Sequence, residues 1–402
     1  MNRFEDNLNV IHLIKNQTSL EKYTGFGGLN KVMSQDDHNR LKAIVTPEEY
    51  QSIIRSFKTA YYTPVSIINF IYAALYQMGF TGGRVLDPAC GHGAFIFNMP
   101  EAMRNNSVIH AVELDRLTAK IAKAICPYAK ILNRGFEHCQ YKENTFDLIV
   151  GNPPYGGFAV TDNNFPQFNK MAIHHYFVAK SIALLKEGGI LAMVLPQYCF
   201  DNLHDHPRNF MQQNGALIAA FRLPDCMFAN AKVTVDIVFY IKRKVNEIHY
   251  QSTKKIQING HHLPINEYYI DYPAHILGKL NTCNMYGERI GLTVTAQSTK
   301  EEIYQCLHQL VSNFAQIITP KQTAKIDDQA IIKAIDAKIQ AIHQSIQEQQ
   351  DNLEKEWLAA EIVKLKHIKA VCQQKINDKH SLIQKVQAIN ENLTLMAQKI
   401  SV

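Results

Sequence analysis

The chain lacks the usual signs of export, of a membrane span and of a cysteine-rich metal site. Its 402 residues include eight Cys, scattered from Cys90 to Cys372 without a CxxC pair, which predicts reduced, mostly buried thiols in a chain that is not secreted. Its apolar runs are far shorter than the roughly 18 residues that cross a bilayer. Acidic residues stand among the first seven, where a secretory signal has its apolar core. We therefore expect a soluble, cytoplasmic protein without a membrane partner.

A large excess of one charge is also missing. Lys and Arg total 42 and Asp and Glu total 36, which gives a net charge of +6, and 46% of the residues are hydrophobic. This composition argues against bulk disorder and against a fibrous repeat, and the length is sufficient for two or three domains. A net charge of this size is compatible with a polyanionic partner but is not evidence for one.

Glycine and proline are absent from the C-terminal part of the sequence. The last Gly is Gly291 and the last Pro is Pro320, so residues 321–402 are expected to be helical. Apolar residues keep a 4-3-4 spacing over 335–357 and again over 382–400, as in a coiled-coil seam. With a turn at 377–381, this spacing predicts a helical hairpin or pairing with another chain. A simple amphipathic bundle fits the same spacing.

Residues 61–244 have the pattern of an α/β domain. Short β-rich runs at 85–87, 108–112, 130–132, 146–150, 190–195 and 233–241 alternate with helical patterns such as 117–125 and 176–185. This alternation predicts a mostly parallel sheet with helices on both faces. Residues 1–60 form a mostly helical lead-in. Residues 245–320 are mixed and are a candidate DNA-contacting extension. Basic clusters at 242–244, just before this region, and at 254–255 within it can position phosphate or simply face solvent.

The first predicted strand runs into a glycine-containing turn at 87–93, the position where open α/β sheets bind ligands. The turn departs from the dinucleotide fingerprint GxGxxG and lacks the Lys-Ser/Thr of a phosphate loop. Asp87 at the strand tip favours a cationic or hydroxyl-rich ligand over a pyrophosphate. Glu113, at the end of the second strand, can accept hydrogen bonds from both hydroxyls of a ribose.

The fourth predicted strand ends in Asn-Pro-Pro-Tyr at 152–155. An amine conjugated to a purine ring is a poor nucleophile because its lone pair is delocalised. The Asn152 side-chain carbonyl and the Pro153 backbone carbonyl can accept its two N–H bonds, and the two prolines hold that geometry. Tyr155 offers a face on which a flipped base can stack. A proline-rich turn alone would explain Pro153 and Pro154 but not the flanking Asn and Tyr.

With these motifs the chain resembles class I S-adenosylmethionine-dependent methyltransferases, whose Rossmann-like fold has a mostly parallel seven-stranded sheet. The order of Tyr-Thr-Pro at 62–64, the glycine turn and Asn-Pro-Pro-Tyr resembles the gamma group of DNA adenine-N6 methyltransferases. Over roughly residues 8–300 the chain is similar to the methylase portion of phage- and plasmid-borne methylase–helicase proteins. The motifs that carry this likeness lie at 20–29, 173–177, 221–225 and 235–239, and no helicase nucleotide-binding loop is present.

The resemblance implies S-adenosylmethionine as the cofactor, double-stranded DNA as the substrate and a bacterial, phage or plasmid restriction-modification context. Beyond the region of resemblance, the apolar seam of the C-terminal helices is expected to pair two copies or to dock a separate recognition or motor subunit. Residues that would hold the cofactor are Thr63 at the methionine carboxylate, Asp87, Ala89 and Gly91 along the methionine, Glu113 at the ribose, Phe136 on the adenine ring, and Asn152. Many relatives have Asp-Phe where this chain has Gly135 and Phe136, and Glu137 is a candidate substitute for that Asp.

Two other classes of function remain open at this stage. Asn-Pro-Pro-Tyr also occurs in methyltransferases that act on a protein glutamine or on RNA, and a non-catalytic DNA-binding or assembly protein could retain the fold. His174 and His175 suggest a metal site. Adjacent His side chains rarely point at one ion, and no third ligand lies at a useful spacing, so we expect packing at a helix start and no metal.

Overall fold

The computed structural model describes residues 3–13, 33–57, 61–203, 206–228, 231–243, 252–284 and 289–311, with isolated residues at 23–29 and between 333 and 373. The chain divides into two compact units, Met1–Thr319 and Pro320–Val402. The predicted helical hairpin of residues 321–402 falls almost entirely outside the described residues and stays a prediction. Among the helices that are described, none combines the length and the apolar character that a membrane crossing requires.

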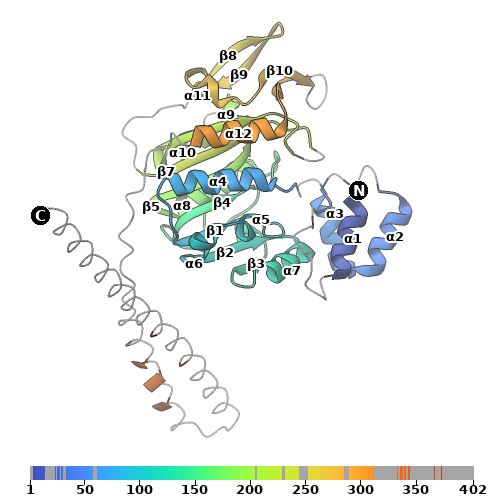
Figure 1. The fold of residues 1–402 in the computed structure, drawn as a ribbon, viewed down its shortest axis with the longest axis vertical. Coiled ribbons are helices and arrows are strands. Elements are labelled where there is room, and N and C mark those ends of the chain that lie inside the picture. The colour runs from blue at the N-terminus through green and yellow to red at the C-terminus, as the bar shows by residue number, and fades with distance from the viewer. Residues whose placement is uncertain are drawn as a thin grey trace, which may run out of the picture. The chain divides into compact units, whose positions relative to one another are not determined.

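A seven-stranded sheet forms the centre of the first unit (Figure 1). The strand order is β3-β2-β1-β4-β5-β7-β6, and all neighbours are parallel except β7, which runs antiparallel to both β5 and β6. This is the topology of the class I methyltransferase fold, as predicted. Its strands are β1 (Arg84–Asp87), β2 (Val108–Glu113), β3 (Lys130–Asn133), β4 (Phe146–Gly151), β5 (Leu185–Pro196), β6 (Gly215–Leu223) and β7 (Val235–Lys242).

Apolar side chains alternate along the strands and pack against helices on both faces of the sheet. On β4, Leu148 and Val150 join one core cluster, whereas Ile149 joins the cluster on the opposite face. The first face is covered by α4 (Val65–Gln77) and α12 (Lys300–Val311), and the second by α8 (Ile173–Leu184) and α10 (His206–Asn214) (Figure 1). Burial on both faces explains why these strands have near-continuous apolar runs.

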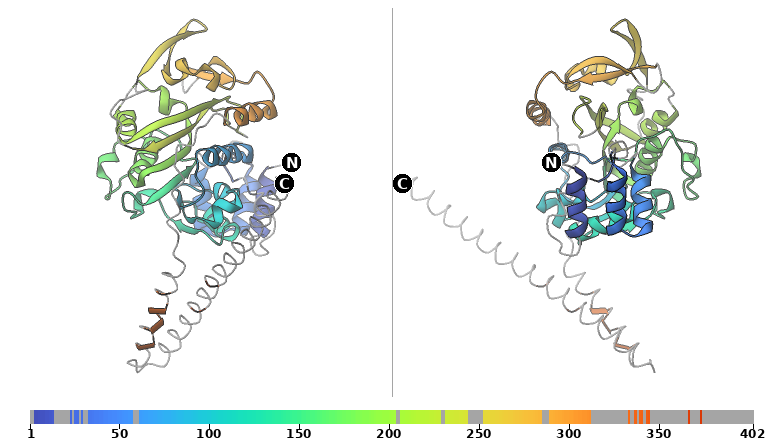
Figure 2. Two further views of the ribbon diagram at one scale, coloured as in Figure 1. Left: turned by 60° about the vertical axis from the view of Figure 1, so that its left-hand side comes forward. Right: turned by 90° about the vertical axis from the view of Figure 1, so that its right-hand side faces the viewer.

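Three N-terminal helices, α1 (Arg3–Leu13), α2 (Gln35–Ile44) and α3 (Pro47–Ser56), pack beside one another and against α7 (Arg116–Ile125), as the second view of Figure 2 shows. Ser34 and Thr46 begin α2 and α3 with reciprocal capping boxes, which define both starts. An ion pair between Glu49 and Lys120 joins α3 to α7. The helices therefore have a defined place against the sheet domain, next to β2 and β3.

Residues 252–295 form two hairpins, β8–β9 (Thr253–Ile258, His261–Asn266) and β10–β11 (Lys279–Asn284, Ile290–Thr295). Asn259 and Gly260 make the tight turn between β8 and β9, and both have positive φ. The remaining short elements are α5 (Ala94–Phe97), α6 (Glu101–Asn105), η3 (Phe136–His138), η4 (Pro166–Phe168), α9 (Tyr198–Asp201), α11 (Tyr268–Asp271) and η5 (Pro273–His275).

A buried ion network explains two of the sequence motifs. Arg222 on β6 lies opposite Asp236 on β7, and its guanidinium donates to both Asp236 oxygens at 2.8 and 2.9 Å. It also donates to both oxygens of Asp201, at 2.7 and 3.0 Å, and stacks over the Tyr269 ring. Arg222 and Asp236 are fully buried, so these contacts replace the water that each charge gives up on folding.

Candidate active site

A cavity of about 390 Å³ opens at the carboxyl ends of β1, β2 and β4. Most of its described lining comes from the 61–63 segment before α4, the glycine turn after β1, the end of β2, and the loops after β3 and β4, and residues of α3 and α8 are among the rest. The residues that line it and bear on function are Tyr61, Tyr62, Thr63, Ala89, Gly91, Glu113, Arg134, Gly135, Phe136, Glu137, Asn152, Pro154, Phe158 and Ile173. Nearly all the predicted cofactor residues therefore meet at one place.

The glycine turn lies against the ring of Tyr62. Gly91 has φ +56°, and a Cβ there would be 2.3 Å from Tyr62 Cε1. Gly25, from the N-terminal segment, has φ +66°, and its Cβ would be 2.1 Å from Tyr62 Cε2. The ring is thus held between two glycines and meets the His92 ring edge-on at 4.6 Å. This use of Gly25 was not apparent from the sequence, because it depends on contact between segments far apart in the chain.

Two buried carboxyl groups lie at the strand tips. Glu113 accepts backbone hydrogen bonds from Gly91 at 2.9 Å and from Asp115 at 2.6 Å, and burial raises its pKa to about 7. Asp87 accepts from the Ala89 N–H at 3.1 Å, and burial raises its pKa to about 8. Asp87 lies behind the turn and is not among the lining residues, so it supports the glycine loop from below.

Several polar atoms in or beside the cavity are buried without a hydrogen-bond partner among the described residues, Asp115 Oδ2 among them. Three of these atoms are Thr63 Oγ1, Asp87 Oδ2 and Asn152 Oδ1. Buried polar atoms in folded proteins are almost always paired, so each exception needs an explanation. All three belong to residues that the sequence assigned to a ligand site. Thr63 and Asn152 line the cavity, so a bound ligand could satisfy both, with an acceptor for the Thr63 hydroxyl and an N–H or O–H donor for Asn152 Oδ1.

The loop after β4 presents its polar and aromatic groups in different directions. The Asn152 amide nitrogen donates to the Tyr61 carbonyl at 3.3 Å, which leaves Oδ1 as the group available for a ligand. Pro154 lines the cavity and Pro153 is buried behind it. Tyr155 donates its hydroxyl to the Val194 carbonyl at 3.1 Å and packs against the core. Its role as a stacking face stays a prediction, and it is not among the lining residues.

Phe158 is an aromatic lining residue that the sequence reasoning missed. Its side chain is 52% exposed and lies beside the cavity, with its backbone oxygen accepting from the Ile173 N–H at 2.8 Å. A large exposed aromatic next to a polar cavity is a natural surface for a planar ligand to stack on. Its position six residues after Asn152 was the only indication in the sequence.

The loop after β3 shows why glycine stands at position 135. A Cβ on Gly135 would lie 2.1 Å from Glu137 Oε1, so the Glu137 carboxylate occupies the space beside this backbone. Gly135, Phe136 and Glu137 all line the cavity. In this arrangement an Asp side chain at 135 would collide with Glu137, and the carboxylate reaches the cavity from two residues further on.

A buried lysine fixes the Phe136 segment in place. Lys180 on α8 donates to Asp162 Oδ2 and to the Phe136 carbonyl, both at 2.7 Å, and its ammonium lies 4.5 Å from the centre of the Phe136 ring. Both charged side chains are fully buried. Asp162 in turn accepts from Tyr176 at 2.6 Å. The network links the loop after β4 to the loop after β3 from beneath the cavity.

We predict that Lys180→Met weakens ligand binding in the cavity roughly 5–10-fold, because the Phe136 carbonyl loses a charge-assisted hydrogen bond. The exposed control is Lys186→Met, which removes a partly exposed pair with Asp147. Lys180→Met combined with Asp162→Asn should regain part of the stability that the single variant loses, since no buried charge is then left unpaired. Calorimetric titration and thermal unfolding measure the two effects. If Lys180→Met binds the ligand as tightly as Lys186→Met does, the network does not position Phe136.

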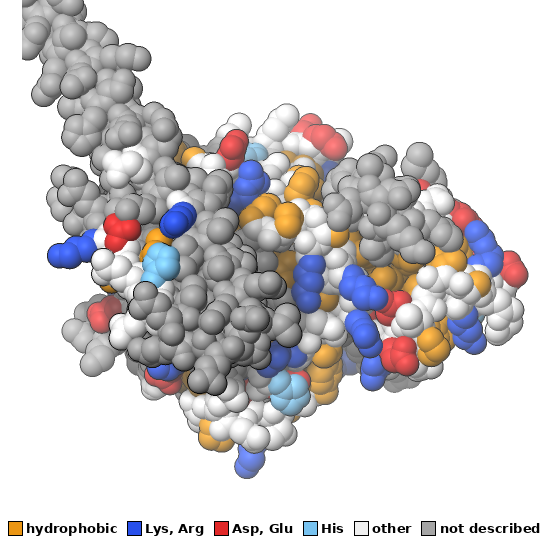
Figure 3. All heavy atoms as spheres, turned by 90° about the horizontal axis from the view of Figure 1, so that it is seen from below, with side chains coloured by type: hydrophobic (Ala, Val, Ile, Leu, Met, Phe, Trp, Pro, Cys, Tyr) orange, Lys and Arg blue, Asp and Glu red, His pale blue; other side chains and the backbone are white. Residues whose placement is uncertain are grey.

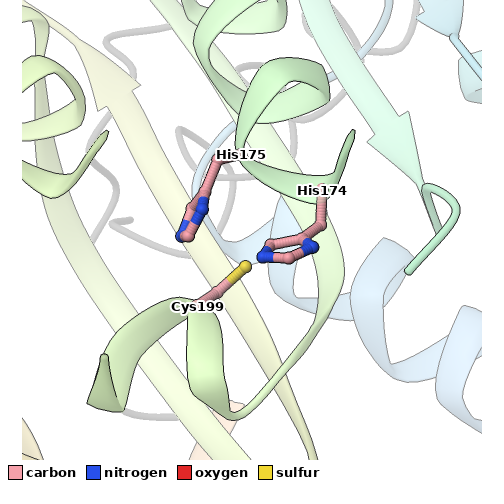
Figure 4. A group of neighbouring side chains, drawn as sticks. All are labelled: His174, His175 and Cys199. Atoms are coloured by element: carbon pink, nitrogen blue, oxygen red, sulfur yellow. The ribbon is translucent and has the colours of Figure 1, made fainter. Parts of the chain in front are cut away.

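His174 and His175 begin α8, and the structure brings a third donor to them. The Nδ1 or Nε2 atoms of both rings and the Cys199 sulfur all lie within 4.8 Å of one another, and all three residues are buried (Figure 4). Cys199 lies 24 residues beyond His175, on α9. Spacing along the sequence did not indicate this group.

Two of the lysines that the sequence suggested as phosphate contacts, Lys242 and Lys254, bond to other groups of this chain. Lys242 donates to Asn144 and to the Ala183 carbonyl, and Lys254 pairs with Glu267 at 2.8 Å. On the face drawn in Figure 3, Lys and Arg side chains lie beside acidic and hydrophobic ones. In that view, the described surface therefore shows no large patch of a single charge sign.

Comparison with known proteins supports the relationship inferred from the motifs. Residues 39–225 match a family described as "Eco57I restriction-modification methylase". The chain is 25% identical over 224 residues to "Defense against restriction protein B" of Escherichia phage P1, covering 54% of this chain and 10% of the phage protein. It is 33% identical over 132 residues to "Type II methyltransferase M.TthHB8I" of Thermus thermophilus, covering 29% of each.

The name of a third relative describes an enzyme that acts on RNA: "tRNA1(Val) (adenine(37)-N6)-methyltransferase" of Haemophilus influenzae. Identity is 32% over 124 residues, covering 28% of this chain and 53% of that protein. The chain thus spans from a tenth to about half of the length of these relatives. The resemblance to restriction-modification methylases is confirmed, and the matched segment contains both the glycine turn and Asn-Pro-Pro-Tyr.

Proposed function

We propose that this chain methylates the exocyclic N6 of adenine in double-stranded DNA, with S-adenosylmethionine as the methyl donor. The observation that carries the proposal is Asn152 Oδ1, a buried acceptor without a partner among the described residues, in a cavity that also contains Glu113 and Phe136. An acceptor in this position suits an amine that must donate a hydrogen bond before it can react.

The cavity's groups fit the parts of this cofactor. Thr63 offers an unpartnered hydroxyl for a carboxylate, Glu113 offers acceptors for ribose hydroxyls, and Phe136 offers an apolar ring surface. Glu137 reaches the same end of the cavity as Phe136, where it could accept from an adenine amine. When bound, the cofactor supplies a methyl group on a positively charged sulfur.

The chain's own residues would prepare the target amine. Asn152 Oδ1 and the Pro153 carbonyl accept its two N–H bonds, which draws nitrogen lone-pair density out of the ring and toward the methyl group. The cofactor would supply the methyl group, and the methylated amine, which is cationic, would release one proton to solvent. A base must leave the duplex to reach this cavity, and exposed Phe158 is the aromatic placed to receive it.

DNA is preferred over RNA and protein because of the sequence relationships. The matched family is a restriction-modification methylase, one relative named above is a protein of defence against restriction, and another is a type II methyltransferase. The tRNA relative keeps RNA as the second candidate. The discriminating experiment incubates the chain with tritiated cofactor and, separately, duplex DNA, tRNA and a release factor. Label in DNA supports the proposal, and label in tRNA or protein alone contradicts it.

We predict that Glu113→Ala weakens cofactor binding by about 1–3 kcal/mol, through loss of charge-assisted hydrogen bonds to the ribose. Binding should also depend on pH. In the free protein the pKa of Glu113 is raised to about 7, whereas a cationic cofactor favours the ionised carboxylate, so binding releases a proton. Affinity should therefore fall about tenfold from pH 8 to pH 6.

Calorimetry in buffers of different ionisation enthalpy measures both the affinity and the proton release. Glu113→Gln should remove this part of the pH dependence, whereas Glu187→Gln, at an exposed position on β5, should keep it. An affinity that is constant between pH 6 and pH 8 would contradict the assignment of Glu113 to the ribose.

The C-terminal segment is proposed to serve assembly, on the evidence of its sequence. An isolated amphipathic helix gains little until its apolar stripe is buried, so residues 321–402 are expected to dock a second copy or a separate recognition or motor subunit. Deleting them should leave cofactor affinity unchanged and lower DNA methylation or the oligomeric mass. A truncated protein with the same mass, the same DNA affinity and the same methylation rate would contradict this role.

A further inference from the structure

Figure 4 shows the His174 ring pointing toward the Cys199 sulfur, with the His175 ring beside them. The donor atoms come from two elements, the start of α8 and the short helix α9 that follows β5. His174 is 3% exposed, His175 4% and Cys199 1%. This group lies outside the cavity lining described above, although Ile173, the residue before it, belongs to that lining.

We propose that His174, His175 and Cys199 bind one d10 metal ion, copper(I) or zinc(II). Two imidazoles and a thiolate are the donors that such ions prefer in proteins. Donors on one ion at bond lengths of 2.0–2.3 Å lie roughly 3.3–3.8 Å apart. The observed group, within 4.8 Å, reaches that geometry with side-chain shifts of about 1 Å.

The state of the His174 ring fits a metal ligand. Its Nδ1 atom is buried without a hydrogen-bond partner among the described residues, and buried polar atoms are almost always paired. A bound ion would satisfy a ring nitrogen of this kind. Burial also lowers the pKa of the two rings, to about 3 and about 4, so both are neutral and each can present a lone pair.

Charge and coordination number distinguish the two ions. Binding displaces the Cys199 thiol proton to solvent, so copper(I) with the thiolate is neutral and three donors satisfy it. Zinc(II) leaves one net positive charge and takes a water as its fourth ligand. Arg208, whose positive charge acts on His175, disfavours a net cation here. The ion would join α8 to α9. Ile173, the residue before His174, donates its backbone N–H to the Phe158 carbonyl, so the ion would also stabilise the loop that contains Asn152.

The test measures metal content directly and needs no methylation assay. The full chain, made metal-free under a thiol-preserving reductant, is titrated anaerobically with copper(I) against a chromophoric chelator and, separately, with zinc(II). Exposed Cys226 and Cys306 are replaced by Ser in all samples, because exposed thiols also bind these ions. We expect one equivalent of either ion and a rise in Tm of roughly 5 °C at a free metal concentration about 100-fold above Kd.

Cys199→Ser and His174→Ala should each abolish that equivalent, whereas Cys139→Ser, at another buried cysteine, should retain it. X-ray absorption of the loaded chain that lacks Cys226 and Cys306 but keeps His174, His175 and Cys199 should show one sulfur and at least two nitrogen ligands. This measurement does not depend on variants that fail to fold. No bound equivalent, a stoichiometry that Cys199→Ser does not change, or a metal spectrum without sulfur would overturn the proposal.

Discussion

Asn152→Ala is expected to lower the methylation rate by about 10³-fold or more while changing cofactor affinity by only a few fold. The reason is that Asn152 Oδ1 acts on the incoming amine and mainly in the transition state, so its loss appears in kcat rather than in cofactor binding. Its amide nitrogen already donates to Tyr61, so the oxygen is oriented before any substrate arrives.

Single-turnover kinetics and calorimetry separate these two quantities for Asn152→Ala. Asn98→Ala is the matched control, because the Asn98 side chain donates only to the Ala94 carbonyl in the same short helix. Near-normal turnover by Asn152→Ala would contradict the proposed chemistry. A large loss of cofactor affinity in the same variant would instead indicate a structural role for Asn152.

The second large effect concerns stability. Arg222→Met should lower the free energy of unfolding by about 3–5 kcal/mol, because Asp201 and Asp236 would be left buried without their shared cation. Arg40→Met removes an exposed pair with Glu5 and should lower the free energy of unfolding far less, because solvent screens exposed ion pairs. Denaturant unfolding of both variants gives the comparison.

Adding Asp201→Asn and Asp236→Asn to Arg222→Met should restore much of the lost stability, since uncharged amides replace the unpaired carboxylates. Equal stability of Arg222→Met and Arg40→Met would show that the buried network contributes no more than a surface pair. The network also fixes α9, because this short helix carries both Asp201 and Cys199.

The sheet domain could be predicted because its signals are local. Apolar runs ended at turn residues, and the chemical motifs stood at strand ends, where the topology then placed Glu113 and Asn152 in one cavity. β6 was missed as a strand because Gly-Ala-Leu-Ile-Ala-Ala, at its start, has no alternation of polar and apolar residues. Its pairing with β7 and the Arg222 ion pairs are what stabilise it there.

Features that join distant segments could not be read from the sequence. Gly25 meets Tyr62 across 37 positions of sequence, Lys180 reaches back to Phe136, and Cys199 joins a histidine pair that had seemed to lack a third ligand. Each contact depends on how crossover helices pack on the sheet. The type and spacing of residues along the sequence do not predict such packing.

Mass spectrometry of nucleosides tests the central claim most directly. Plasmid DNA from cells that express the full chain, or that express Asn152→Ala at the same level, is digested to nucleosides and analysed for methylated bases in a host without adenine methylation of its own. The proposed function predicts N6-methyladenine with the unaltered chain and none with Asn152→Ala. DNA without N6-methyladenine in both strains, together with methylated tRNA or protein in the first, would contradict it.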